Sequence, residues 1–142
     1  MDAVESQEED LARIVVGTLD DAARAAYARA FDERRDTTGG LGDMDSCLRE
    51  AQLYEVQVGG VTIARYALKQ VDRARGTEVF IVAAAGHAPG FDLVQSIEPV
   101  IAAQCAEVDS IVINTRRRGL VKKLSKQGWT LDAFVMRKKI HV

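Results

Sequence analysis

The sequence feature that most constrains the fold is a run of three β-rich segments between Leu53 and Gly86. The first two flank Gly59-Gly60, and a glycine pair accepts the positive φ angles that a tight hairpin turn requires. A second turn, at 72–76, leads into the third segment, 77–86, which is apolar almost throughout. A nearly continuous apolar strand is typical of the covered centre of a sheet. The pattern therefore predicts an antiparallel meander of three strands whose last strand is central.

Helical patterns lie on either side of this meander. Residues 18–35 repeat apolar side chains at three- and four-residue steps, and we expect Thr18 to cap that helix. Residues 91–109 show the same periodicity, with Asp92 as the candidate cap. Pro99 leaves two alternatives for the second helix, because proline lacks an N–H and crowds the preceding turn. Either one helix kinks at Pro99, which we favour, or the main helix begins there.

Shorter patterns complete the chain. They predict a first strand over 11–17, a short helix after the loop 36–43, a buried strand over 110–115, a helix over 116–128, and one or two closing strands over 129–140. A helix that crosses from one strand to the next in the same sheet makes the two strands parallel. We therefore predict a single α/β domain over 11–142, with a mixed sheet and helices on both faces. The acidic residues 1–10 are expected to form a flexible tail.

Charge divides the chain into two unequal parts. Residues 1–115 carry 20 acidic and 10 basic side chains, whereas residues 116–142 carry 1 acidic and 9 basic side chains. This asymmetry is typical of a surface that binds a polyanion, but it also fits a solvated helix and strand with outward lysines, which we favour. Nucleic-acid binding through Arg116 to Lys126 is a weaker alternative, because Trp129 is the only aromatic residue nearby for base stacking.

The cysteines and the apolar runs indicate the compartment. Cys47 and Cys105 stand far apart, and neither belongs to a CxxC pair or a zinc-type cluster, so no metal is expected. Cys105 falls on the apolar stripe of its helix and is expected to be buried. No apolar run reaches the roughly 20 residues of a membrane span, and the acidic N-terminus does not resemble a signal peptide. We therefore expect a protein of the cytoplasm that makes no membrane contact.

The stretch FIVAAAGHAPGFDLV, residues 80–94, joins the central strand to the second helix through a tight turn. The first N–H groups of a helix have no partner within it, and the positive end of the helix dipole lies there. A strand, a turn and a helix start thus form a common phosphate-binding arrangement. The motif alone leaves open whether this turn holds a phosphate.

The meander, the turn GHAPGFD, the strand SIVINT and the ending LSKQGWTLDAFVMRKKI resemble the GNAT superfamily of acetyl-CoA-dependent N-acetyltransferases. More narrowly, they resemble the divergent GNAT-like proteins of tailed bacteriophages. The resemblance covers the chain from about Thr18 onward. It implies a GNAT-like acyl-CoA N-acyltransferase fold, with acetyl-CoA as cofactor and an amine as acceptor. It also implies phage proteins as partners and, for a protein of phage origin, a place in the host cytoplasm or in the phage particle. A homo-oligomer is a further expectation.

The resemblance implies specific cofactor contacts. The pantetheine arm of coenzyme A is expected where the fourth strand splays from the fifth, against the backbone around Ile81, Val82 and Ala84. The turn after that strand would hold the pyrophosphate. In its family pattern, Gln/Arg-x-x-Gly-x-Gly/Ala, Gly90 matches and His87 stands in place of Gln or Arg.

Two further features of the resemblance concern phosphate. Asp92 stands where the family has Gly or Ala, and at about 4 Å a carboxylate would repel a phosphate by about 1 to 4 kcal/mol. In the alternative interpretation, Asp92 is simply the helix cap and Gly90 a turn residue. Arg116, Arg117 and Arg118 open the last helix and would meet the 3′-phosphate of coenzyme A, a nucleic-acid backbone or an acidic protein.

The resemblance also implies catalytic positions. Glu78, on the fourth strand, would be the general base, although an exposed carboxylate at a strand end, which we favour, also explains it. The tyrosine that serves as general acid in many family members is replaced by Leu124, and Ser125 is a poor substitute. Two functional hypotheses follow. The chain is either an N-acetyltransferase, or a catalytically inactive GNAT-fold component of phage structure or morphogenesis that acts through protein contacts.

Overall fold

The computed structural model describes residues 12–86 and 92–141. Its elements are β1 (Arg13–Val16), α2 (Asp21–Tyr27), the 3₁₀ helix η1 (Ala28–Phe31), α3 (Met44–Arg49), β2 (Gln52–Val58), β3 (Val61–Arg73), β4 (Gly76–Gly86), α4 (Leu93–Gln104), β5 (Ser110–Val112) and α5 (Arg118–Ser125). Residues 1–11 and the turn 87–91, with His87, Pro89 and Gly90, lie outside the described residues. The predictions made for that tail and that turn therefore stay predictions.

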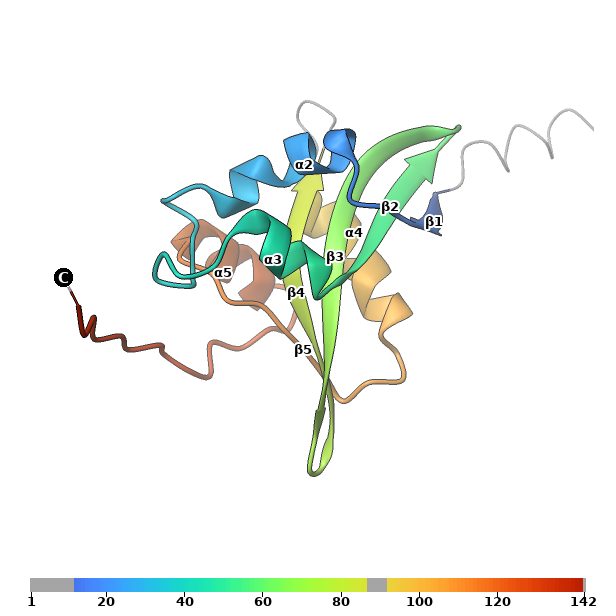
Figure 1. Cartoon of the computed structure of the whole chain (residues 1–142). Helices are drawn as coiled ribbons and strands as arrows, with labels where there is room; N and C mark the ends of the chain where they lie inside the picture. The colour runs from blue at the N-terminus through green and yellow to red at the C-terminus, as the bar shows by residue number, and fades with distance from the viewer. Residues whose placement is uncertain (1–11, 87–91, 142) are drawn as a thin grey trace, which may run out of the picture.

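The five described strands form one sheet in sequence order, β1-β2-β3-β4-β5 (Figure 1). The first four pair antiparallel, and β4 pairs with β5 in parallel. Gly59 and Gly60 join β2 to β3 with φ angles of 57° and 77°. These angles suit the primed turns that match the twist of a hairpin. The predicted meander, its glycine hairpin and the following β-α-β unit are confirmed.

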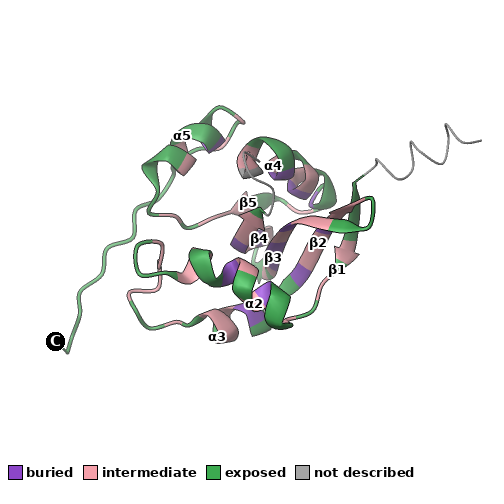
Figure 2. Cartoon of the chain, turned by 90° about the horizontal axis from the view of Figure 1, so that it is seen from above, coloured by how far each residue is buried: buried purple, intermediate pink, exposed green. Residues whose placement is uncertain are grey.

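Helices cover both faces of the sheet, as predicted (Figure 2). On one face, Ile97 and Ile101 of α4 and the cap residue Cys105 pack with strand side chains that include Val56, Tyr66, Leu68 and Val79. On the other face, Ala23 and Tyr27 of α2 and Leu48 of α3 pack with Leu53, Ala67 and Ala83. Burying these apolar side chains stabilises the fold by roughly 25 cal/mol for each Å² removed from water.

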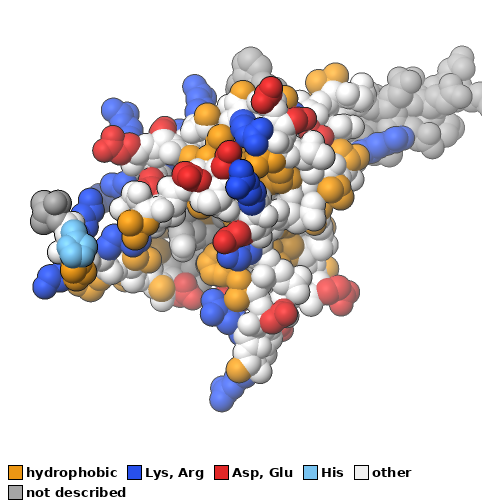
Figure 3. All heavy atoms as spheres, in the orientation of Figure 1, with side chains coloured by type: hydrophobic (Ala, Val, Ile, Leu, Met, Phe, Trp, Pro, Cys, Tyr) orange, Lys and Arg blue, Asp and Glu red, His pale blue; other side chains and the backbone are white. Residues whose placement is uncertain are grey.

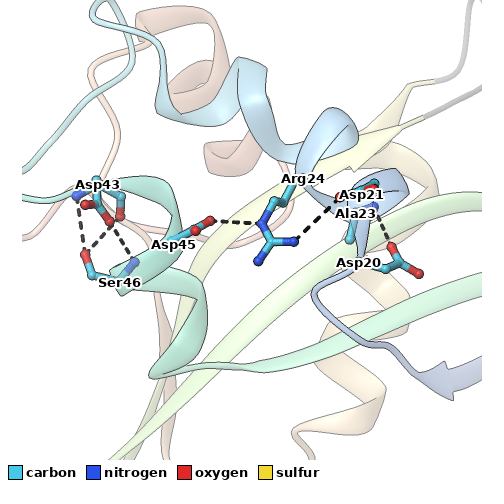
Figure 4. A network of polar contacts seen from close by, with 7 residues as sticks. All are labelled: Asp20, Asp21, Ala23, Arg24, Asp43, Asp45 and Ser46. Carbon is cyan, nitrogen blue, oxygen red and sulfur yellow. Dashed lines mark hydrogen bonds and ion pairs between the residues drawn. The ribbon is translucent and has the colours of Figure 1, made fainter.

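The helices of the second face begin at aspartate caps (Figure 4). Asp20, not the predicted Thr18, caps α2, because its Oδ1 accepts a hydrogen bond of 2.8 Å from Ala23 N. Asp43 caps α3 in a capping box with Ser46. Between the two helices, Arg24 Nε lies 3.2 Å from Asp45 Oδ1. The first predicted helix is also shorter than expected, because the chain tightens into η1 after Tyr27.

Helix α4 is a single helix that contains Pro99, so the alternative in which the main helix begins at Pro99 is wrong. Asp92 caps it, since Asp92 Oδ1 accepts from Gln95 N at 3.2 Å. Cys105 is buried at its end, as expected. Burial raises the pKa of the Cys105 thiol, which disfavours the reactive thiolate.

The closing strands expected over 129–140 are absent. Residues 126–141 form neither helix nor strand. A strand forms only where its backbone N–H and C=O groups find a partner strand, and within the described chain this segment has none. Among the described residues, no helix is long and apolar enough to cross a membrane.

Candidate functional site

The candidate site begins where β4 and β5 stop pairing. Their parallel register runs over Glu78↔Ser110, Val79↔Ile111 and Phe80↔Val112, and β4 then continues to Gly86. The chain after β5 instead turns away toward α5 (Figure 1). Within the described chain, the backbone edge of β4 that faces β5 therefore has no strand partner beyond Phe80. Unpaired peptide groups on this edge are available to a ligand.

A β-bulge lies in this unpaired part of β4. Ala67 of β3 lies opposite Ala83 and Leu68 opposite Ile81, so Val82 is an extra residue. The bulge changes the side-chain alternation, and Ile81 and Ala84 pack toward the α4 face while Val82 packs toward the α2 face. Bulges of this kind redirect side chains and interrupt the hydrogen-bond ladder, and they are frequent beside active sites.

A cavity of about 300 Å³ occupies the space that the diverging strands leave. Ile81 to Ala84 form one wall, and the chain end of β5, from Ile113 to Thr115, forms another. Helices α4 and α5 contribute from one side, and Phe31 of η1 with the loop 35–38 from the other. The lining therefore combines elements from both faces of the sheet around an interior that is mostly apolar.

Two sets of polar contacts fasten the walls of this cavity. The Arg116 guanidinium donates to the carbonyl oxygens of Glu33, at 3.2 Å, and Asp36, at 3.4 Å. This holds the β5–α5 connection against the loop after η1. On the other side, the Trp129 indole N–H donates to Glu98 Oε1 at 3.1 Å, which ties the end of α5 to α4.

Charged side chains line the cavity among the apolar ones. The cations are Arg35, Arg117 and Lys123, and the carboxylates are Asp36 and Glu98. The Asp36 carboxylate accepts from the Thr38 hydroxyl at 2.7 Å and from Gly40 N at 2.7 Å. These hydrogen bonds, with that of Thr38 first, hold the pKa of Asp36 below its ordinary value. Asp36 is therefore a fixed negative charge near neutral pH and a weak proton acceptor.

The start of α4 carries a balanced pair of charges. Lys123 Nζ of α5 lies 3.7 Å from Asp92 Oδ2. The hydrogen bond from Gln95 N, and then Lys123, lower the pKa of the Asp92 carboxyl. Asp92 is thus both the helix cap and the partner of a cation, and the nearby ammonium offsets part of the repulsion that a phosphate would meet there.

The structure brings together four of the predicted cofactor residues. Ile81, Val82, Ala84 and Arg117 all line the cavity. Arg116 and Arg118 instead line a second groove, which they share with Arg117. His87 and Gly90 lie outside the described residues.

Glu78 lies apart from this group. It stands in the paired part of β4, opposite Ser110, and is not among the residues that line the cavity. Its Oε2 lies 2.7 Å from Arg73 Nε near the tip of the β3–β4 hairpin. Its role as general base stays a prediction, whereas the predicted alternative, a carboxylate near a strand end, fits this ion pair.

Several lining residues have no counterpart in the sequence-based prediction. Phe31, Asp36 and Thr38 lie in a stretch that we interpreted only as a helix end and a glycine-rich loop. The pattern Asp-Thr-Thr-Gly-Gly favours a turn in which a carboxylate accepts backbone N–H groups. That signal predicts the turn, but only the fold places it opposite β4. Among the described residues, no three His, Cys, Asp or Glu side chains form a group that fits a metal ion.

Several solved structures with this fold are described as acetyltransferases. One described as a possible acetyltransferase from Clostridium difficile 630 superposes with a TM-score of 0.66 at 14% identity, covering 93% of this chain and 99% of its own. This chain has a GNAT-like fold. A predicted acetyltransferase with acetyl-CoA from Clostridium acetobutylicum has a TM-score of 0.62 at 10% identity, covering 92% of this chain and 97% of its own.

A Bacillus subtilis acetyltransferase in complex with CoA superposes with a TM-score of 0.59 at 18% identity, covering 87% of this GNAT-fold chain and 79% of its own. No protein-family model matches the chain, and no curated protein matches its sequence. At these identities the likeness shows the fold alone, and it confirms the predicted fold class over most of the chain.

Proposed function

We propose that this protein is an N-acetyltransferase that moves an acetyl group from acetyl-CoA to an amine. The observation that carries the proposal is the cavity beside the unpaired edge of β4, between Ile81 and Ala84. Two of the similar structures were solved with CoA or acetyl-CoA, and the fold they share supports the same donor here.

The backbone and side-chain groups around the cavity fit the proposed cofactor. A pantetheine arm is a narrow chain with two amide groups, and a free strand edge offers the alternating N–H and C=O groups that such amides pair with. The apolar side chains around the cavity suit its methylene groups. Arg117 and Lys123 supply positive charge for the phosphates, which Arg bonds with a planar fork and Lys with a point charge.

Acetyl-CoA would supply an acetyl group activated as a thioester. The chain's own contribution is to orient the thioester and the amine and to exclude water from them. The edge of β4 that has no strand partner beyond Phe80 offers backbone N–H groups that would stabilise negative charge developing on an acyl oxygen. On the opposite side of the cavity, Asp36 carries a fixed negative charge that can hold the ammonium form of an acceptor amine.

Transfer also requires that the amine lose a proton before its nitrogen attacks. Glu98 of α4 is one of the carboxylates that line the cavity, and Glu78 is the base implied by the family resemblance. Proton transfer by a positioned side chain contributes about 10²- to 10⁴-fold to a rate. We expect Glu98→Gln or Glu78→Gln to lower kcat by a factor in this range, depending on which carboxylate acts.

A second candidate function rests on Leu124. It occupies the position of the family's tyrosine acid, and it is buried and apolar in the cavity lining. A leucine cannot protonate a leaving thiolate, so the same fold without catalysis is the alternative. In that case the protein acts through protein contacts, as a phage structural or morphogenesis component would.

An assay of thiol release separates the two functions. The full chain is incubated with acetyl-CoA and a panel of primary amines that includes polyamines, amino sugars and peptide N-termini. The CoA thiol that is released is measured with a colorimetric thiol reagent. Release that depends on an amine and falls in the variants Glu98→Gln or Glu78→Gln supports the transferase. If acetyl-CoA binds but no amine in a broad panel accelerates thiol release, the non-catalytic alternative is favoured.

A further inference from the structure

The second groove, which the three arginines before and at the start of α5 line, has a volume of about 520 Å³. Residues 113–118 form one wall, to which Val121 of α5 adds. The loop residues Thr37 and Gly39 and the C-terminal segment 131–137 contribute the rest. Pockets that hold small molecules have volumes of about 300 to 1,000 Å³, so the groove is large enough for a ligand of its own.

The groove continues the cavity beside β4. The residues that line both are Asp36, Thr37, Ile113, Asn114, Thr115 and Arg117. The Asp36 carboxylate is therefore at the junction of the two, where hydrogen bonds from the Thr38 hydroxyl and from Gly40 N fix it. An ammonium group held by Asp36 would have the cavity on one side and the groove on the other.

Positive charge dominates the groove. Its charged lining residues are four arginines, Arg116, Arg117, Arg118 and Arg137, and one carboxylate, Asp36. Within residues 12–86 and 92–141, the ion pairs of the chain involve none of these arginines. A guanidinium binds a carboxylate or a phosphate through two parallel hydrogen bonds. The groove therefore has the charge and the donors for an anionic group.

Two contacts hold Arg137 in the wall of the groove. Its Nη2 donates to the Thr37 carbonyl oxygen at 3.1 Å. Its side chain also lies directly against Gly39, where an added Cβ would come within 2.5 Å of Arg137 Cδ and Nε. Gly39 has a φ of 70°, which glycine adopts without strain. A guanidinium has five N–H donors, so one hydrogen bond to Thr37 leaves others for a ligand.

Apolar side chains accompany the arginines. Phe134 and Val135 line the groove although they are 85% and 73% exposed, and Leu131 and Val121 line it with them. Figure 3 shows hydrophobic and basic side chains gathered around the C-terminal end. A ligand that combines apolar groups with an anion would bury this apolar surface and pair with the guanidinium groups at the same time.

We propose that the groove holds the tail of the acceptor amine, and that this tail carries a carboxylate or a phosphate. The amine lies at Asp36, the apolar part of the tail contacts Phe134 and Val135, and the anion binds Arg118 and Arg137. The inference rests on the proposed N-acetyltransferase function and adds the class of acceptor. The amine nitrogen bonds to the acetyl carbon as the C–S bond of the thioester breaks, and the proton that the amine loses balances the thiol that leaves.

The same charges select against other amines. The second ammonium group of a polyamine would lie among the arginines of the groove and be repelled, and a neutral tail would leave the guanidinium groups without an anion. Arg118 and Arg137 are exposed, so the preference for an anionic tail should decrease above about 0.1 M salt.

Matched amines test the acceptor class with the full chain and acetyl-CoA. The amines 6-aminohexanoate, 6-aminohexanamide, 6-aminohexyl phosphate and 1,6-diaminohexane share one carbon chain and differ at its far end. We expect kcat/KM for the carboxylate or the phosphate to exceed that for the neutral amide by about tenfold to a hundredfold, with the diamine poorest. The better of the two anions identifies the group that the groove binds. Equal kcat/KM for the amide and both anions would overturn the inference and leave the proposed function in place.

Variants of Arg118 test the groove itself, because Arg118 does not line the cavity. Arg118→Gln should raise KM for the preferred anionic amine about tenfold and leave KM for acetyl-CoA and for the neutral amide unchanged. Arg118→Glu should shift the preference toward the diamine, which a loss of folding alone would not do. Lys122→Gln removes one charge from the same helix outside both pockets and is the control. An unchanged preference in Arg118→Glu would contradict the proposal.

Binding without turnover distinguishes failure of this inference from failure of the proposed function. N-acetylated 6-aminohexanoate, its phosphate counterpart and its neutral amide cannot accept an acetyl group, and calorimetry measures their binding to the full chain. At least one anion should bind at least tenfold more tightly than the amide, and Arg118→Gln should remove the difference. If this holds but no amine is acetylated, the proposed function fails while the ligand class of the groove stands. If both anions and the amide bind equally, the inference is wrong even where amines are acetylated.

Discussion

At the scale of single residues, the three consecutive arginines at and just before the start of α5 have different surroundings. Arg116 donates to two carbonyl oxygens of the loop after η1, Arg117 lines the proposed cofactor cavity, and Arg118 lines only the second groove. The sequence presents them as one basic triplet. Their separation follows from the geometry of the turn between β5 and α5, which directs consecutive side chains to different places.

This separation predicts unequal effects on cofactor binding. Arg117→Gln should weaken CoA binding about threefold to tenfold, the loss of about 0.7 to 1.4 kcal/mol. The effect should shrink as salt is raised above about 0.1 M, because ions screen exposed charges. Arg118→Gln is the matched control and should leave binding unchanged. Calorimetric titration of both variants with CoA measures the difference, and equal losses would refute the assignment of Arg117 to the cavity.

Asp92 leads to a prediction about acid stability. Its pKa is lowered in the folded chain, first by the hydrogen bond from Gln95 N. A depressed carboxyl pKa contributes stability that is complete above the unfolded value, near 4, and is lost as the pH falls through the folded value. Asparagine can keep the cap but does not titrate. Asp92→Asn should therefore lose less stability than the parent chain between about pH 5 and pH 2.

Urea denaturation at several pH values measures this difference. Asp36 and Asp43 also have lowered pKa values. The parent chain and Asp92→Asn both retain these two carboxylates, so the general loss of stability in acid should remain in both. Identical acid profiles for the parent chain and Asp92→Asn would show that Asp92 does not contribute in this way.

At the scale of elements, α5 ends through a glycine in the left-handed region. Gly128 has a φ of 90°, and Trp129 N donates to the Leu124 carbonyl oxygen at 3.1 Å. This hydrogen bond brings the chain back over the helix end and positions Trp129 against Glu98. The cavity wall formed by α4 and α5 therefore depends on how the helix terminates.

Two glycine substitutions in and after α5 should have opposite effects. A Cβ at Gly128 or Gly119 would meet nothing within 4 Å, so neither substitution creates a steric clash with another element. Gly128→Ala forces alanine into a positive φ and should destabilise the fold by about 1 kcal/mol. Gly119→Ala lies inside α5 at a negative φ and should stabilise it by about 0.5 to 1 kcal/mol. Thermal denaturation measures both, and a shift in the same direction would contradict this account of the helix end.

The elements also show which features of the fold could be predicted from the sequence. The meander, the apolar stripe of α4 and the cap at Asp92 were predictable, because glycine turns, helical periodicity and caps are local signals. The bulge at Val82 was not, since it depends on the register between β3 and β4. The last segment was predicted as a strand from its apolar and β-branched residues, but pairing depends on a partner that local pattern does not supply.

At the scale of the whole molecule, the cavity exists because the two halves of the sheet diverge. The meander continues β4 to Gly86, whereas the short β5 ends at Val112 and leads into α5. The sequence predicted Ile81, Val82 and Ala84 through the family resemblance. It did not predict Asp36 or Glu98, because residues so far apart in the chain share a cavity only after η1, α4 and β4 have packed.

Binding of CoA to the cavity beside β4 is the central claim, and calorimetry of the full chain with CoA tests it most directly. We expect one site per chain with a Kd below about 1 mM. Ala84→Leu would project into the cavity and should abolish binding, whereas Ala85→Leu, on the same strand but packed toward the α2 face, controls for the cost of overpacking. Binding by the parent chain and Ala85→Leu but not by Ala84→Leu is the predicted result. No heat at millimolar CoA, or equal binding by both variants, would contradict it.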